Sequence, residues 1–180
     1  MTKIETSLAD VLLLEPRVFG DERGFFLESY NEKAFAQMGI CDRFVQDNQS
    51  HSSRNVIRGL HYQIGQPQGK LVRVITGEIL DVALDLRRSS PTFGKWESFT
   101  LSAANKRMLW IPPGFAHGFR VLSEAADVVY KATDFYAPEQ ERTVAWNEPS
   151  LNIDWQLDGN AVVSNKDQRG ARFEECEKFD

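Results

Sequence analysis

Three histidines are the residues of this sequence most suited to chemistry, and their surroundings limit what that chemistry can be. They are His51, His61 and His117. The two cysteines, Cys41 and Cys176, lie too far apart for a paired zinc motif, and we expect both to be free thiols. Patterns typical of serine hydrolases, phosphate-binding loops and dinucleotide-binding folds are also absent. Proton transfer by a histidine is the reaction type that remains.

A metal site is the alternative use of these histidines. Metal-binding cupins, which are jelly-roll proteins, use a His-x-His pair, a glutamate and a later histidine in a P-x-G-x-x-H turn. The later turn is present as "PPGFAH" (112–117), but His61 is followed by Tyr62 and Gln63. Two histidines are few ligands for a stable metal site, so we expect none.

His61 lies in the strand-like stretch "VIRGLHYQ" (56–63), where it suits either a general base or a hydrogen-bonded interior side chain. A regular strand would place His61 and Arg58 on opposite faces. Gly59 between them can mark a β-bulge that turns both toward one pocket. Arg58 and Arg23 each precede a glycine and suit bidentate phosphate binding, although either can also be a solvated surface residue.

Three more polar residues have types that suit proton transfer beside a carbonyl group. Lys70 opens an apolar strand, where it either stabilises an oxyanion or marks a solvated strand end. Tyr130 alternates with apolar residues, so it faces inward as a core side chain or as a general acid. Asp167 lies in "SNKD" (164–167), and nothing nearby in the sequence pairs it with His61.

The elements that must position these residues are mainly strands. Residues 70–87 contain two strand-like runs around a Thr-Gly-Glu turn, and residues 107–111 form another run. Residues 117–122 and 127–133 flank "SEAA", which we interpret as a hairpin turn. One helix is expected at residues 31–40, with Asn31 as its N-cap and Gly39 just past its end. From about residue 147 the pattern is less regular. Many short strands with frequent glycine and proline favour a β-sandwich or barrel.

The composition bounds the class of protein. The 180 residues suit one domain, 1–180, with a sizeable core. A net charge of −5 argues against a nucleic-acid binder. No apolar run approaches the roughly 20 residues of a membrane span, and the first 16 residues lack a signal-peptide pattern. We therefore expect a cytoplasmic protein without membrane or nucleic-acid partners.

Eight segments in order resemble the dTDP-4-dehydrorhamnose 3,5-epimerase family, metal-free cupin-like enzymes of bacterial deoxysugar synthesis. The segments lie at residues 15–30, 44–50, 57–63, 67–74, 90–96, 105–119, 130–141 and 164–167. The resemblance implies a mainly β, cupin-like jelly-roll barrel with a few short helices and no cofactor. It also implies a homodimer in which some nucleotide contacts come from the partner subunit.

The resemblance assigns a role to each candidate residue. His61 is implied as the base that removes a proton beside a 4-keto group, with Asp167 orienting it. Tyr130 is the implied acid, and Lys70 faces the C4 oxygen of the enolate. The implied substrate-binding residues are Arg23 and Arg58 for the diphosphate, Glu28, Gln46 and Asn48 for polar contacts, Phe19 and Phe26 for the pocket wall, Tyr136 for stacking on thymine, His117 near the sugar, and Lys166 beside Asp167.

The implied reaction inverts C3 and C5 of dTDP-4-dehydro-6-deoxy-D-glucose and gives dTDP-4-dehydro-L-rhamnose, a precursor of lipopolysaccharide or other cell-wall polysaccharide. Three alternatives stay open. The first is an epimerase of one centre only, from a related deoxysugar pathway. The second is a metal-dependent cupin oxygenase, against which the missing His-x-His pair argues. The third is a non-catalytic sugar-nucleotide binding module, which has no need of His61, Lys70, Tyr130 and Asp167 together.

Overall fold

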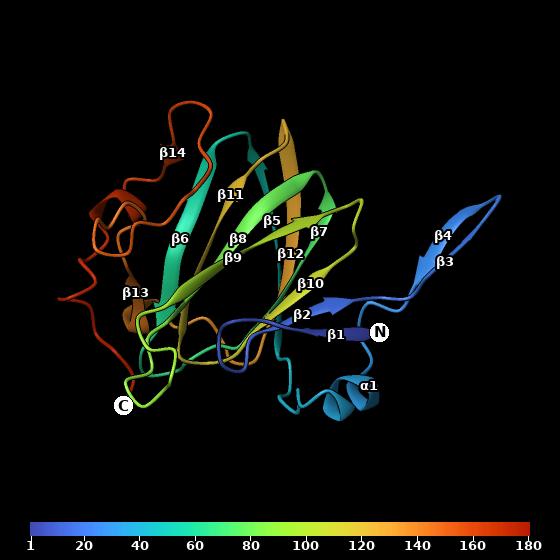
Figure 1. Cartoon of the computed structure of the whole chain (residues 1–180), viewed down its shortest axis with the longest axis horizontal. Helices are drawn as coiled ribbons and strands as arrows, with labels where there is room; N and C mark the ends of the chain where they lie inside the picture. Colours follow the sequence, from blue (N-terminus) through green and yellow to red (C-terminus); the bar gives the residue numbers. More distant parts are fainter.

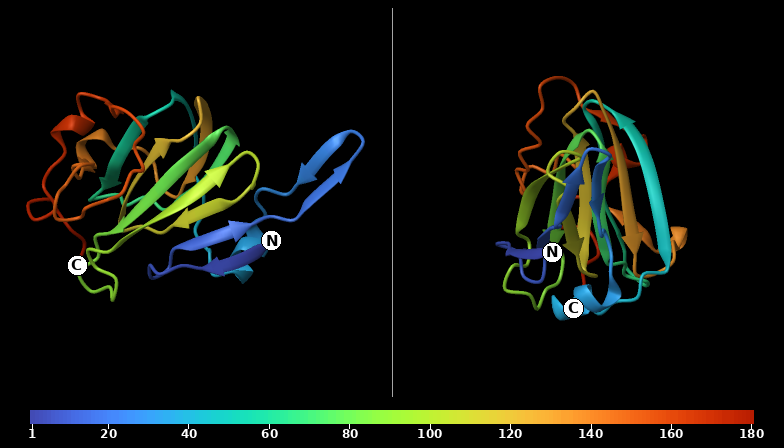
Figure 2. Two further views of the ribbon diagram at one scale, coloured as in Figure 1. Left: turned by 45° about the horizontal axis from the view of Figure 1, so that its top comes forward. Right: turned by 90° about the vertical axis from the view of Figure 1, so that its right-hand side faces the viewer.

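Two facing sheets of mostly antiparallel strands form the body of the molecule (Figures 1 and 2). The computed structural model describes residues 1–180. The first sheet has the order β1 (Thr2–Glu5), β2 (Leu12–Glu15), β10 (Met108–Ile111), β7 (Lys70–Thr76), β12 (Ala125–Ala132) and β5 (Gln46–Ser53). The second has the order β13 (Glu141–Thr143), β6 (Val56–Gln63), β11 (Phe115–Val121), β8 (Glu78–Asp85) and β9 (Trp96–Ser102), with β14 (Val162–Val163) parallel to β6. The predicted β-rich barrel is confirmed.

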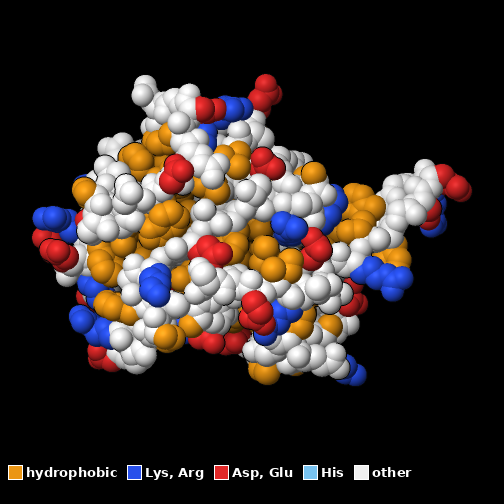
Figure 3. Space-filling view, viewed as in Figure 1, with side chains coloured by type: hydrophobic (Ala, Val, Ile, Leu, Met, Phe, Trp, Pro, Cys, Tyr) orange, Lys and Arg blue, Asp and Glu red, His pale blue; other side chains and the backbone are white.

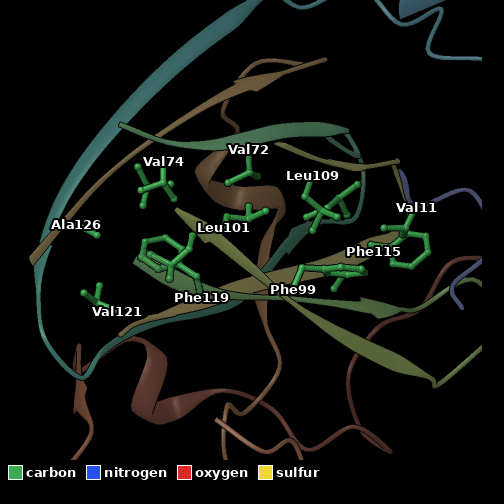
Figure 4. Close-up of a cluster of buried hydrophobic side chains, with 14 of the residues drawn as sticks. Val11, Val72, Val74, Phe99, Leu101, Leu109, Phe115, Phe119, Val121 and Ala126 are labelled. Atoms are coloured by element: carbon green, nitrogen blue, oxygen red, sulfur yellow. The ribbon is translucent and has the colours of Figure 1, made fainter. Parts of the chain in front are cut away.

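The main core lies between these sheets. Figure 4 shows side chains from both sheets converging there, among them Val72, Leu109 and Phe119. Strand β8 is buried on both faces because a second cluster covers the outer face of its sheet. That cluster includes Leu84 of β8 and Trp155 of the irregular C-terminal segment. The C-terminal segment therefore packs on the barrel rather than forming a unit of its own.

Helices are short and few. Helix α1 (Glu32–Gln37) begins where predicted, because the Asn31 side chain accepts a hydrogen bond from the Ala34 amide at 3.2 Å. Gly39 follows its end with φ of +94°, a conformation that favours glycine. The 3-10 helices η1 (Pro138–Gln140) and η2 (Asp167–Arg169) complete the set. None of the helices has the length and apolar character needed to span a bilayer.

The prediction of a hairpin at "SEAA" is wrong. Strand β11 pairs with β6 and β8 in the second sheet, whereas β12 pairs with β5 and β7 in the first. The connection therefore crosses from one sheet to the other, as in a jelly roll. A short polar turn between two alternating runs looks the same in the sequence whether the strands pair or separate.

One element stands clear of the barrel. Strands β3 (Val18–Asp21) and β4 (Gly24–Leu27) pair only with each other and extend away from the body, and we call residues 18–27 the projecting hairpin (Figures 1 and 2). Its aromatic side chains are exposed, with Phe25 at 61% and Phe26 at 69% (Figure 3). Exposed aromatic residues on an isolated ribbon indicate a surface that contacts something else.

Candidate active site

A polar cavity opens between the two sheets, with a volume of about 380 Å³. Both sheets contribute to its wall, so residues distant in the sequence meet there. The lining residues are Gln46, Asn48, Ser50, Arg58, His61, Gln68, Lys70, His117, Phe119, Tyr130, Tyr136 and Glu141.

A bulge in β6 brings Arg58 and His61 to this cavity together. His61 lies opposite His117 of β11, but Arg58 lies opposite Phe119, so three steps along β6 match two along β11. Gly59 makes this possible, because its φ is +121° and a Cβ atom there would lie 2.5 Å from the Cα of the neighbouring strand's glycine. The predicted bulge is confirmed.

The imidazole of His61 is paired with the carboxylate of Asp167, 2.6 Å from Nε2 to Oδ1. Asp167 is only 3% exposed. Burial raises the pKa of the Asp167 carboxyl, but the charge of His61 and hydrogen bonds with His61, Gly59 and Ser164 together leave this pKa lowered. Asp167 reaches the site because β14, just before η2, pairs in parallel with β6. The pair is an imidazole held in place by a buried carboxylate.

A second histidine–carboxylate pair lies deeper in the wall. Asp81 is fully buried, and its two oxygens lie 2.9 and 3.0 Å from Nε2 of His117. Burial lowers the pKa of His117, although Asp81 opposes that change. Sequence reasoning missed Asp81, because an aspartate in an alternating strand is typical of a solvent-facing position.

Lys70 is buried beside these pairs and is not a solvated strand end. It is 9% exposed, and Nζ donates to the carbonyl oxygen of His61 at 3.4 Å. Burial lowers the pKa of Lys70 to about 8, although Asp81 and Glu141 both favour the charged form. A cation in such a dry site interacts strongly with an anion formed next to it.

Tyr130 lies on β12, in the sheet opposite the one that carries His61. Burial raises the pKa of its hydroxyl, so the phenol stays protonated at neutral pH. The cavity thus has an imidazole base on one wall and a proton-carrying phenol on the other. That arrangement can take a proton from one face of a bound molecule and return one to the opposite face.

Glu141 is a lining residue that sequence reasoning missed. It accepts a hydrogen bond from the hydroxyl of Tyr136 at 2.8 Å and forms an ion pair with Lys166. Burial raises the pKa of its carboxyl, but Lys166 and Tyr136 outweigh burial and leave it lowered. In the sequence, only its position in the family-like segment "YKATDFYAPEQE" (130–141) pointed to a functional role. Glu141 connects two predicted binding residues to the cavity.

The remaining predicted residues divide into two groups. Gln46 and Asn48 line the cavity and are joined by a hydrogen bond of 3.0 Å. The other group lies outside the cavity of its own chain. It contains Phe19, Arg23 and Phe26 on the projecting hairpin, and Glu28 just after the hairpin. The guanidinium of Arg23 pairs with Asp21 within the hairpin. No group of three or more metal-ligating side chains occurs in the chain.

Comparison with known proteins gives a consistent picture. The family model described as dTDP-4-dehydrorhamnose 3,5-epimerase matches residues 5–175. The chain is 58% identical over 180 residues to the dTDP-4-dehydrorhamnose 3,5-epimerase of Pseudomonas aeruginosa, covering 99% of both. A Legionella pneumophila dTDP-6-deoxy-D-glucose-3,5-epimerase, solved with dTDP-4-keto-L-rhamnose, matches with a TM-score of 0.95 at 50% identity, covering 98% of this chain and 94% of that one.

A relative with a narrower reaction also matches. The 3'-monoepimerase of Streptomyces bikiniensis, solved with dTDP-quinovose, has a TM-score of 0.88 at 30% identity, covering 94% of this chain and 86% of that one. The same fold therefore serves for inversion of one centre or of two. The cupin-like jelly roll implied by the sequence is confirmed.

Proposed function

Because the chain belongs to the dTDP-4-dehydrorhamnose 3,5-epimerase family, it is a carbohydrate epimerase, and we propose that it inverts both C3 and C5 of dTDP-4-dehydro-6-deoxy-D-glucose. The product is then dTDP-4-dehydro-L-rhamnose. The observation that carries this proposal is the placement of the His61–Asp167 pair and Tyr130 on opposite walls of one cavity. Inversion needs proton removal and proton return on opposite faces of the sugar.

The proposed mechanism starts from the 4-keto group, which acidifies the protons on C3 and C5. His61 removes one of these protons, and Asp167 stabilises the imidazolium that forms. The electron pair moves onto the C4 oxygen, where the Lys70 ammonium stabilises the enolate; one such donor in a dry site contributes about 3–4 kcal/mol. Tyr130 then returns a proton from the other side.

The dimer is part of the proposal. The projecting hairpin carries Phe19, Arg23 and Phe26 away from the chain's own cavity. We propose that the hairpin reaches the cavity of a second copy, where Arg23 joins the partner's Arg58 on the diphosphate. In a two-fold dimer this exchange is reciprocal, so both cavities are completed. Burial of the hairpin's aromatic residues favours such an assembly.

The rest of the proposal follows the family resemblance. The enzyme works in the cytoplasm, needs no cofactor or metal, and supplies a sugar for cell-surface polysaccharide. Tyr136 stacks on the thymine at the cavity mouth, and Gln46, Asn48, His117, Glu28 and Lys166 provide polar contacts.

A single-centre epimerase is the second candidate, because a 3'-monoepimerase shares the fold. Proton NMR of the 4-keto sugar nucleotide with the enzyme in D₂O distinguishes the two. We expect deuterium at both C3 and C5, with dTDP-4-dehydro-L-rhamnose formed. Deuterium at one carbon alone would support the second candidate, and deuterium at neither would overturn the epimerase proposal.

A further inference from the structure

Two residues that line the cavity each have a buried polar atom without a hydrogen-bond partner in the protein. These atoms are Nδ2 of Asn48 and Oγ of Ser50, and no other buried side-chain nitrogen or oxygen of the chain shares this state. Buried polar groups in native proteins are almost always paired, because an unpaired one loses its interaction with water without compensation. Two such atoms in one wall therefore indicate a group that binds there.

Both atoms belong to the same face of β5. Alternate residues of a strand point the same way, and Gln46, Asn48 and Ser50 all line the cavity. The next residue in this row is Ser52, whose hydroxyl accepts a hydrogen bond from Nε of Arg58 at 2.9 Å. At the other side of Ser50, Asn48 lies opposite Tyr130 in the pairing of β5 with β12. Ser50 thus lies between Ser52, which binds Arg58, and Asn48, which pairs with Tyr130.

The chemistry of the two atoms defines what they bind. The Oδ1 atom of Asn48 already accepts from Gln46, so the free amide nitrogen of Asn48 is a donor. The hydroxyl of Ser50 can donate or accept. The Arg58 guanidinium reaches across from β6 to Ser52 of β5, so the free groups beside Ser50 are predominantly donors. They suit an oxygen acceptor.

We propose that Ser50 is a substrate-binding residue that acts with the Asn48 amide on an oxygen at the junction of the diphosphate and the sugar. This inference rests on the proposed function for the identity of the ligand, in which Arg58 binds the diphosphate and Tyr130 faces the reacting ring. Because Ser50 lies between these two residues along β5, it meets the substrate where its two parts join. The oxygen belongs to a phosphate or to a sugar hydroxyl, and the two sources are separable by experiment.

The test uses Ser50→Ala in the full-length enzyme, with Ser52→Ala as the matched control from the same row. In the free protein, Ser50→Ala breaks no hydrogen bond, so its melting temperature should equal or exceed that of wild type. Ser52→Ala removes the acceptor of Arg58 and should lower the melting temperature. This difference separates a binding role from a structural one.

Binding is then measured by calorimetry with dTDP-glucose and with dTDP. Loss of one hydrogen bond should weaken dTDP-glucose binding by Ser50→Ala about tenfold. Equal weakening for dTDP assigns the contact to a phosphate oxygen, whereas weakening for dTDP-glucose alone assigns it to a sugar hydroxyl. Unchanged affinity for both ligands, or a melting temperature lowered as far as in Ser52→Ala, would overturn the inference. Failure of the wild-type enzyme to bind either ligand would overturn the proposed function and this inference together.

Discussion

The carboxylate of Asp167 lies 2.6 Å from Nε2 of His61, although 106 positions separate the two residues in the chain. The contact fixes the orientation of the His61 ring. Asp167→Asn keeps the geometry and removes the charge, so we expect the rate to fall by about two to four orders of magnitude.

His61→Asn should abolish both solvent exchange at C3 and C5 and product formation. Deuterium wash-in by a folded His61→Asn enzyme at the wild-type rate would show that His61 is only a core residue.

Tyr130→Phe tests the acid alone. It keeps the ring and its packing on the core and deletes only the hydroxyl. The variant should retain some deuterium exchange while net epimerisation falls, because His61 can return a proton to the face from which it came. Exchange and product are followed by NMR in the same tube, after circular dichroism confirms the fold. Loss of exchange and product in equal proportion would count against an acid role for Tyr130.

The buried charge of Lys70 predicts opposite effects of pH on activity and stability. If the ammonium form stabilises the enolate, kcat should decline as pH rises through about 8, the pKa of Lys70. Tyr130 does not account for this decline in kcat, because burial raises the pKa of its hydroxyl. Asp81 and Glu141 favour the charged form of Lys70, and His61, His117 and Tyr130 line the same cavity.

Stability should change in the other direction. The pKa of Lys70 in the folded protein lies below the ordinary lysine value of 10.5, so between pH 8 and 10.5 the unfolded chain holds a proton that the folded protein has lost. This group therefore makes stability rise with pH in that window. Lys70→Met should be more stable than wild type by roughly 3 kcal/mol at neutral pH, and the gain should shrink above pH 8. Chemical denaturation at pH 7 and pH 9.5 measures both values.

Mixing two inactive variants tests whether the projecting hairpin completes the partner's cavity. Arg23→Ala and His61→Asn enzymes, unfolded and refolded together, should regain activity, because each hybrid dimer contains one intact site. Random mixing makes half of the dimers hybrid, so about a quarter of wild-type activity is expected. Arg58→Ala mixed with His61→Asn is the control, since both residues line the cavity of one chain. The control should stay inactive, and a first mixture that also stays inactive would contradict the exchange of hairpins.

Metal removal should leave the enzyme active. The imidazoles of His61 and His117 are each paired through Nε2 with a carboxylate, and no third ligand completes a metal-binding group. We expect full activity after exhaustive treatment with EDTA, and no stoichiometric metal by elemental analysis. Activity that disappears with EDTA and returns with one divalent ion would contradict this expectation.

Local patterns in the sequence predicted the features that depend on neighbouring residues. The strands followed from alternation, the start of α1 from Asn31, and the bulge from Gly59. The pairing of His117 with Asp81 did not follow, because it depends on the register between β8 and β11. The prediction of a hairpin at "SEAA" was wrong for the same reason, since the pairing of strands depends on the packing of the whole barrel.

Burial was the second kind of information that the sequence lacked. Ser50 lies in a polar strand, "QDNQSHSS", at the edge of its sheet, and such a strand is typical of a solvated surface. Only the fold shows that its alternate residues face the cavity between the two sheets. The projecting hairpin is the opposite case. The family resemblance implied that Phe19 and Phe26 line the pocket, but both are exposed and lie outside the cavity of their own chain.

The chain order of the two halves of the proposed base has a consequence for biosynthesis. Every strand that lines the cavity precedes residue 144, and Asp167 follows β14, which pairs beside β6. A ribosome therefore synthesises all of the cavity's strands, with His61 and Arg58, before it adds the carboxylate that pairs with the histidine. A translation product that stops between these points lacks Asp167, and it also lacks Cys176 and the rest of the C-terminal end that covers the outer face of the second sheet. Truncation there removes the partner of the histidine and uncovers part of the barrel at the same time.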